Sequence, residues 1–107
     1  MIKGSEYSIM TTISKTKSSY YRRLYIAHLI ENGLTTVPAI IDYTGMPRRT
    51  AQDTIKSLSE LDIICVFNQA KGERNRSGQY KIIDWGAINK HWIAEHLTDI
   101  KAALDYP

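Results

Sequence analysis

The sequence of 107 residues predicts a mainly helical α+β domain: three helices, a β-hairpin and a further C-terminal helix. Three observations support this fold class. Apolar residues recur at helical spacing in three segments of the first half of the chain. Two short segments rich in β-branched and aromatic residues flank a polar, glycine-containing stretch, which is typical of a hairpin. A long amphipathic segment then follows, and the total length fits one domain.

The first predicted helix covers roughly residues 19–32. Ser18 or Ser19 is a suitable N-cap, and Gly33 stands where a helix often ends in a left-handed residue. Apolar side chains cover most of the circumference of this helix. Such a helix is buried in its own domain or shared with a partner.

A short second helix and a third helix follow. Thr36 is an N-cap candidate, Pro38 fits the first turn, and Gly45 tolerates the dihedrals of the turn that ends this helix. Met46 and Pro47 lie directly before the third helix, which is expected to reach about residue 61. Its inward stripe recurs at intervals of three and four residues: Ala51, Ile55, Leu58 and Leu61.

The hairpin is predicted from strands at residues 63–67 and 79–83, joined by the polar segment 70–78 with Gly72 and Gly78. Asp84 is a candidate cap for a single last helix over residues 85–104. On a helical wheel the apolar residues of this helix gather on one side, which predicts that it packs against another surface.

The charge of +3 is unevenly distributed along the chain. Residues 46–81 carry seven basic and four acidic side chains, whereas residues 82–107 carry two basic and four acidic ones. This asymmetry predicts a basic working surface and a separate C-terminal element with another role. A mildly basic chain permits a nucleic-acid partner without requiring one.

Several classes of function are disfavoured. The single cysteine, Cys65, excludes an intramolecular disulfide and any site built from several cysteines, and its place in a strand predicts a buried, inert thiol. His28, His91 and His96 have no recognised metal-ligand spacing, and no catalytic motif stands out. We therefore expect no enzyme activity, metal, cofactor or small-molecule ligand. Without a membrane-spanning or secretory segment, a cytoplasmic location is expected.

Three segments carry a resemblance to a known family: TVPAII at residues 36–41, TGMPRRTAQ at 44–52 and LSELDII at 58–64. Together they resemble the winged helix-turn-helix domain of bacterial transcriptional regulators, over about residues 19–84. The DWGAI segment at 84–88 is similar to a small group of uncharacterised bacterial winged-helix proteins. The resemblance implies sequence-specific binding of double-stranded DNA by a small bacterial or phage-type regulator.

In that interpretation residues 47–61 form the recognition helix in the major groove, and loop 70–78 is the wing tip on the backbone or in the minor groove. The candidate contacts on the helix are Arg48, Arg49, Thr50, Gln52, Asp53 and Lys56, and those on the wing are Lys71, Arg74, Asn75 and Arg76. Arginine and glutamine side chains suit guanine and adenine edges. Asp53 could accept a hydrogen bond from cytosine, orient an arginine, or weaken DNA binding.

The chain divides into an arm at residues 1–17, the winged domain at 18–84 and a packing or dimerisation helix at 85–107. A homodimer is expected because two-fold symmetry suits palindromic operators. Its candidate contacts are Trp85, Ile88, Trp92, Ile93, Leu97, Ile100 and Leu104. Two alternatives remain: the last helix caps only its own core, or the winged domain serves protein–protein assembly without binding DNA.

Overall fold

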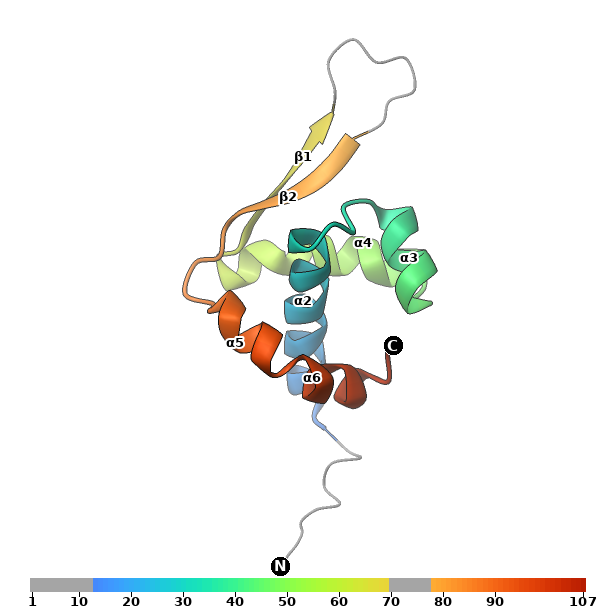
Figure 1. The fold of residues 1–107 in the computed structure, drawn as a ribbon, viewed down its shortest axis with the longest axis vertical. Coiled ribbons are helices and arrows are strands. Elements are labelled where there is room, and N and C mark those ends of the chain that lie inside the picture. The colour runs from blue at the N-terminus through green and yellow to red at the C-terminus, as the bar shows by residue number, and fades with distance from the viewer. Residues whose placement is uncertain (1–12, 70–77) are drawn as a thin grey trace, which may run out of the picture.

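The computed structural model describes residues 13–69 and 78–107 and confirms the mainly helical α+β fold. Figure 1 shows α2 at the centre, the other helices packed around it and the hairpin projecting from one end. Along the chain the elements are α2 (Lys15–Glu31), α3 (Val37–Thr44), α4 (Arg48–Lys56), the 3₁₀-helix η2 (Ser57–Leu61), β1 (Ile64–Gln69), β2 (Gly78–Asp84), α5 (Lys90–Glu95) and α6 (Leu97–Leu104).

The helix α2 is the centre of the core. Its residues Leu24, Tyr25, Ile26 and Ala27 are each 0% exposed, so apolar neighbours surround the helix on every side at this level. The predicted start at residue 19 is wrong, because the Ser14 hydroxyl already caps the helix by accepting a hydrogen bond from the Lys17 backbone N–H at 3.0 Å. Residues 15–17, expected in the arm, therefore belong to α2.

The second helix and its turn agree with the sequence prediction. The Thr36 side chain accepts a hydrogen bond from the Ala39 N–H at 3.2 Å, and Gly45 ends α3 with a left-handed φ of 78°. The buried Thr44 hydroxyl donates to the Ile40 carbonyl and accepts from the Met46 N–H. These bonds satisfy the polar groups of the turn and set the direction in which α4 leaves.

The third predicted helix is shorter than expected: its α-helical part ends at Lys56, and the chain continues to Leu61 as the 3₁₀-helix η2. Ser57 stands at the junction, where its hydroxyl donates to the Thr54 carbonyl at 2.9 Å and accepts from Arg23 Nε at 2.8 Å. A serine hydroxyl that bonds to a preceding carbonyl competes with the α-helical pattern. The tighter 3₁₀ turn then leads into the hairpin.

The two antiparallel strands, β1 and β2, are each longer than predicted. Cys65 pairs with Ile82, Phe67 pairs with Tyr80, and the register shifts between Ile64 and Cys65. The Tyr80 N–H donates to the Thr35 carbonyl at 2.8 Å. This bond attaches the hairpin to the loop between α2 and α3, so the hairpin has a defined position relative to α4.

The single helix predicted for residues 85–104 is wrong, and so is Asp84 as its cap. The Asp84 carboxylate accepts a hydrogen bond from the Gly86 N–H at 2.8 Å within a turn, and α5 starts only after Asn89. The Asn89 side chain is the cap, accepting from the backbone N–H groups of His91 and Trp92. The turn formed by residues 85–89 directs the chain from the hairpin back toward α2 (Figure 1).

The helix is interrupted again at His96, which separates α5 from α6. The imidazole Nδ1 of His96 lies 2.8 Å from the Trp92 carbonyl, a second contact to the end of α5. The bend allows Ile93 and Ile100, each 0% exposed, to reach the core from two different helices. A straight helix would present one stripe and could not curve around α2 in this way.

The chain end is held against the middle of α2. Tyr106 stacks on Tyr25 with ring centroids 5.8 Å apart, and the Tyr25 hydroxyl donates to the Pro107 carbonyl at 2.7 Å. Burial, followed by the neighbouring Tyr43 and Tyr106, raises the pKa of Tyr25 to about 12. The Tyr25 phenol is therefore neutral and acts as a hydrogen-bond donor at physiological pH.

A substitution at Gly86 tests the importance of the turn that connects the hairpin to the C-terminal helices. The φ of Gly86 is +59°, and a Cβ added there would lie 2.6 Å from the Asp62 carbonyl oxygen. We expect Gly86→Ala to lower the free energy of unfolding by about 1–3 kcal/mol, through steric overlap added to backbone strain. Urea denaturation measures this change.

The matched control is Gly45→Ala, because Gly45 also has a positive φ but a Cβ there would meet no atom within 4 Å. Gly45→Ala should therefore cost less than Gly86→Ala. Equal losses for the two variants would show that the close approach of Gly86 to Asp62 has no energetic importance.

Candidate nucleic-acid interface

The predicted contact residues of the third helix lie together on the outer face of α4. Ala51, Thr54 and Ile55 are buried against the core, which directs the opposite side of the helix outward. The residues on the outward side are all exposed: Arg48, Arg49, Gln52, Asp53 and Lys56. Thr50 is half-buried at the edge that faces α2.

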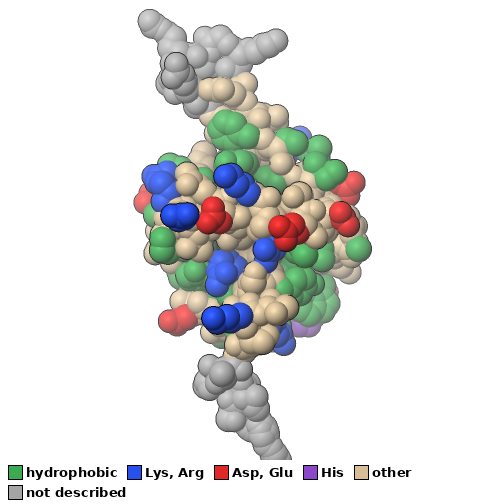
Figure 2. Space-filling model, turned by 180° about the vertical axis from the view of Figure 1, so that it is seen from behind, with side chains coloured by type: hydrophobic (Ala, Val, Ile, Leu, Met, Phe, Trp, Pro, Cys, Tyr) green, Lys and Arg blue, Asp and Glu red, His purple; other side chains and the backbone are tan. Residues whose placement is uncertain are grey.

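The cations of this surface are interspersed with acids. Figure 2 shows the molecule from behind the view of Figure 1, with Lys and Arg side chains spread over the face and Asp and Glu among them. The Asp53 carboxylate lies 3.8 Å from Arg49 Nε, with the two side chains 66% and 91% exposed. Such an exposed pair contributes about 0.3–0.5 kcal/mol, so it biases the direction of Arg49 without immobilising it.

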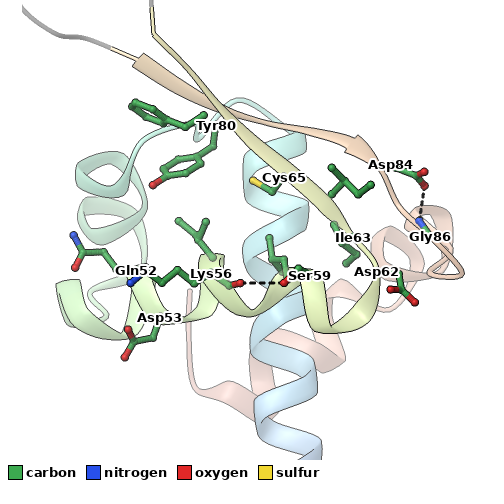
Figure 3. Close-up of a pocket in the computed structure, with 14 residues that line it drawn as sticks. Gln52, Asp53, Lys56, Ser59, Asp62, Ile63, Cys65, Tyr80, Asp84 and Gly86 are labelled. Carbon is green, nitrogen blue, oxygen red and sulfur yellow. Dashed lines mark hydrogen bonds between the residues drawn. The ribbon is translucent and has the colours of Figure 1, made fainter.

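A groove of about 800 Å³ separates α4 and η2 from the hairpin (Figure 3). Ile55, Leu58 and Ile63 supply buried apolar side chains on the helix side. On the hairpin side Phe67 and Tyr80 contact each other with ring centroids 4.8 Å apart. The groove therefore has a largely apolar lining between two polar ends.

The two ends of the groove differ in charge. Gln52, Asp53 and Lys56 lie at the end formed by α4, whereas Asp62 and Asp84 lie at the end where the hairpin joins the body (Figure 3). The end near α4 thus holds one cation and one carboxylate, whereas the end near Asp84 holds two carboxylates and repels a phosphate group. The sequence did not reveal this groove, although the alternation of Cys65 with Phe67 along β1 does place both on one side.

Cys65 lies half-buried in the wall of the groove. Burial raises the pKa of its thiol, and a hydrogen bond with the backbone of Lys81 acts in the opposite direction. The prediction of a buried thiol is therefore wrong in part, because the groove leaves Cys65 half-exposed. The raised pKa leaves little thiolate at neutral pH, which is consistent with low reactivity.

The predicted wing-tip contacts Lys71, Arg74, Asn75 and Arg76 lie outside the described residues. Their contribution to the surface stays a prediction.

The predicted dimer contacts have different environments in the structure. Ile93 and Ile100 are fully buried in the core of their own chain, and four others pack against that core half-buried: Trp85, Ile88, Leu97 and Leu104. Trp92 is 39% exposed and stacks on His96 with centroids 3.9 Å apart. Most of this set therefore completes the monomer, and Trp92 is the member that presents a large exposed surface.

Trp92 has an aromatic neighbourhood that the helical wheel did not predict. Together with Tyr20, Tyr21 and Lys17 of α2 it lines a shallow, mostly apolar depression. Tyr20 is 37% exposed, and its ring centroid lies 6.2 Å from that of Tyr21. Only the packing of α5 on α2 brings Trp92 beside these tyrosines.

Residues 13–69 and 78–107 contain no group of three or more His, Cys, Asp or Glu side chains placed to hold a metal ion. No helix in the same ranges is long and apolar enough to cross a membrane.

Comparison with known proteins places this fold in a family. The model of the winged helix-turn-helix family matches residues 15–104, and the chain belongs to this family. The crystal structure of a DUF2131 family protein from Shewanella amazonensis superimposes with a TM-score of 0.83 and 36% sequence identity, covering 90% of this chain and 92% of that one. No curated protein matches the sequence.

Within this fold, α3 and α4 form the helix-turn-helix, and the β1–β2 hairpin is the wing. The matched region includes α5 and the whole of α6, so the C-terminal helices are part of the family domain. The resemblance inferred from the sequence is thereby confirmed.

Cys65 offers a chemical test of the groove. Because its thiol is half-buried and its pKa is raised, we expect alkylation by iodoacetamide at pH 8 to be at least about tenfold slower in the folded protein than in urea. Mass spectrometry of timed samples measures the rates. Equal rates in the two states would contradict the position of Cys65 in the groove wall.

Proposed function

We propose that this protein binds double-stranded DNA in a sequence-specific manner and acts as a small transcriptional regulator, with α4 in the major groove. The observation that carries the proposal is the outward row Arg48, Arg49, Gln52 and Lys56 on a helix whose opposite side is anchored in the core. A recognition helix requires this combination of a rigid inner face and a polar, cationic outer face.

The N-terminal end of α4 is suited to contact base edges. Arg48 and Arg49 occupy its first turn, the part of a recognition helix that enters the major groove most deeply. A guanidinium group can donate to both O6 and N7 of guanine, and the Gln52 amide can pair in a bidentate manner with adenine. In this proposal Asp53 orients Arg49, as their separation of 3.8 Å allows.

The wing and the groove between α4 and the hairpin would contact the DNA backbone beside this helix. Lys56 and Gln52 occupy the end of the groove nearest to α4, where they would offer a DNA phosphate a cation and an amide donor. The Asp53 carboxylate lines the same end, and its ion pair with Arg49 offsets its charge. Beyond β1 the chain continues into the segment with Lys71, Arg74, Asn75 and Arg76, which we propose to follow the backbone or enter the minor groove. These contacts would make the affinity for DNA depend strongly on salt.

The first test replaces both arginines of the α4 N-terminus. Because a bidentate base contact is worth about 1–3 kcal/mol, Arg48→Ala/Arg49→Ala should weaken binding to a selected DNA site at least about tenfold. Fluorescence anisotropy measures the affinity, with DNA sites selected from a random library by the parent protein. The melting temperature should change little, because both side chains are exposed.

A control of equal charge change is Lys90→Ala/Lys101→Ala, which removes two cations from α5 and α6. This variant should bind the selected site like the parent. If the arginine variant also binds like the parent, α4 is not the recognition helix. Failure of the library to yield any enriched sequence would contradict sequence-specific binding altogether.

We further propose that the protein acts as a homodimer, with Trp92 and Tyr20 in the interface. Their exposed aromatic surfaces adjoin each other across α5 and α2, and buried aromatic side chains contribute strongly to interfaces. A two-fold dimer would place two copies of α4 on the two halves of an inverted repeat.

Sedimentation of the full chain at tens of micromolar tests the dimer. The parent should sediment as a dimer and Trp92→Ala should shift toward the monomer. The control is Tyr43→Ala, which truncates a 47% exposed aromatic residue on α3 and should leave the dimer intact. A strictly monomeric parent would overturn this proposal, while leaving DNA binding by α4 to its own test.

A second candidate function is a protein–protein interaction module. It is favoured by the exposed apolar side chains of the hairpin on the wall of the groove, where Ile64 and Phe67 are 46% and 51% exposed. Exposed apolar residues that lie together mark contact surfaces for other macromolecules. This candidate becomes the better one if the library selection enriches no DNA sequence.

A further inference from the structure

A second, smaller pocket lies between α2 and α4, away from the groove beside the hairpin. Its volume is about 380 Å³ and its lining is mostly polar. The helix α2 contributes two arginines and a serine, and the helix α4 and its junction with η2 contribute hydroxyl groups and one carboxylate. The residues are Ser19, Arg22, Arg23, Thr50, Asp53, Thr54 and Ser57.

Arg23 is held in a fixed orientation within this pocket. Its Nε donates to the Ser57 hydroxyl at 2.8 Å, and its Nη1 donates to the Ser19 carbonyl at 3.1 Å and to the Ser19 hydroxyl. These bonds use Nε and Nη1 of Arg23, and none of them uses Nη2. A guanidinium that is pre-oriented in this way loses little entropy when it binds a further oxygen atom.

Arg22 has an unsatisfied donor. Its side chain is half-buried, and its Nε is buried with no hydrogen-bond acceptor among residues 13–69 and 78–107. A buried donor without a partner is costly, and within a protein such a group normally has an acceptor. Arg22 also lines the pocket, where the terminal nitrogen atoms of its guanidinium group can donate to the oxygen atoms of an anion.

The charge of the pocket is positive. Two guanidinium groups face one carboxylate, Asp53, which is 66% exposed and has Arg49 as its ion-pair partner on the outer face of α4. The hydroxyls of Ser19 and Thr50 add groups that can donate hydrogen bonds, whereas the Ser57 hydroxyl already donates to the Thr54 carbonyl and serves to hold Arg23. Paired guanidinium groups with hydroxyl donors are the chemistry that binds tetrahedral oxyanions.

We propose that this pocket is a binding site for a phosphate group, with Arg22 and Arg23 as its principal ligands. The phosphate can come from two sources: the DNA backbone beside the major groove that α4 would occupy, or a free inorganic or small-molecule phosphate. The first source rests on the proposed function, whereas the second does not. In either case the site extends the functional surface from α4 to α2, where the sequence predicted no contact.

The first experiment uses inorganic phosphate and the full chain without DNA. Titration is followed by NMR through the arginine Nε–H signals and the backbone amides of Thr50 and Ser57. We expect saturable shifts of these signals in the parent protein, loss of saturation in Arg22→Gln and weaker binding in Arg22→Lys, which keeps the charge but loses the planar fork.

The control for this titration is Lys90→Gln, which removes the same charge from the exposed ion pair with Glu31 and should bind phosphate like the parent. The melting temperature and signal dispersion of Arg22→Gln verify that the variant is folded. Shifts that are identical in the parent and in folded Arg22→Gln, or no shifts in the parent, mean that free phosphate does not bind here.

The second experiment identifies the source. If the pocket binds a backbone phosphate, Arg22→Gln should reduce the slope of log affinity for duplex DNA against log salt by about 0.9, equally for selected and random sequences. Lys90→Gln should leave the slope unchanged. An unchanged slope together with specific phosphate shifts would assign the pocket to a free anion.

The proposal is overturned if neither experiment distinguishes Arg22→Gln from the parent. Its failure is separable from that of the proposed function, because the phosphate titration contains no DNA and the variants of Arg48 and Arg49 leave the pocket residues intact. If the α4 variant loses DNA binding while Arg22→Gln leaves the salt slope unchanged, the proposal that α4 binds DNA stands. The pocket at Arg22 and Arg23 would then bind only free phosphate.

Discussion

The burial on all sides of the middle of α2, at residues 24–27, is the constraint on which the rest of the structure depends. Leu24, Tyr25, Ile26 and Ala27 are fully enclosed, and complete burial of a large apolar side chain contributes about 1.5–3 kcal/mol. The helices α4, α5 and α6 and the strand β2 all pack on this one helix. Because α4 gives its inner face to this core, its outer residues Arg48, Gln52 and Lys56 are exposed.

The position of the candidate DNA surface follows from that arrangement. The helix α4 is anchored through buried residues such as Ala51 and Ile55, and Ser57 both shortens it and links it to Arg23 of α2. The hairpin is tied to the loop between α2 and α3 through the Thr35 carbonyl. The helix α4 and the wing are therefore held by the same core. This arrangement creates the groove between α4 and the wing, and the arginine pocket on the other side of α4.

Local signals in the sequence were sufficient for some elements and misleading for others. Thr36 and Gly45 bound α3 as predicted, because caps and left-handed ends act within a few residues. The extent of the last helix was misjudged, because periodic apolar residues persist across the break at His96. A periodic pattern records which residues are buried, and two helices that curve around a core can share one pattern with a straight helix. The predicted dimer contacts were inferred from the same apolar pattern, and most of these side chains pack against the core of their own chain.

By itself the sequence determined the fold class, the helix-turn-helix, the wing and the row of polar residues along the outer side of α4, since these depend on spacing along one element. Tertiary structure alone decided which distant side chains meet. It placed Arg22 and Arg23 beside Thr50, Trp92 beside Tyr20, and Lys56 and Asp84 at opposite ends of one groove. These contacts join residues from different helices and strands, and their distances depend on how the elements pack, which no local spacing encodes.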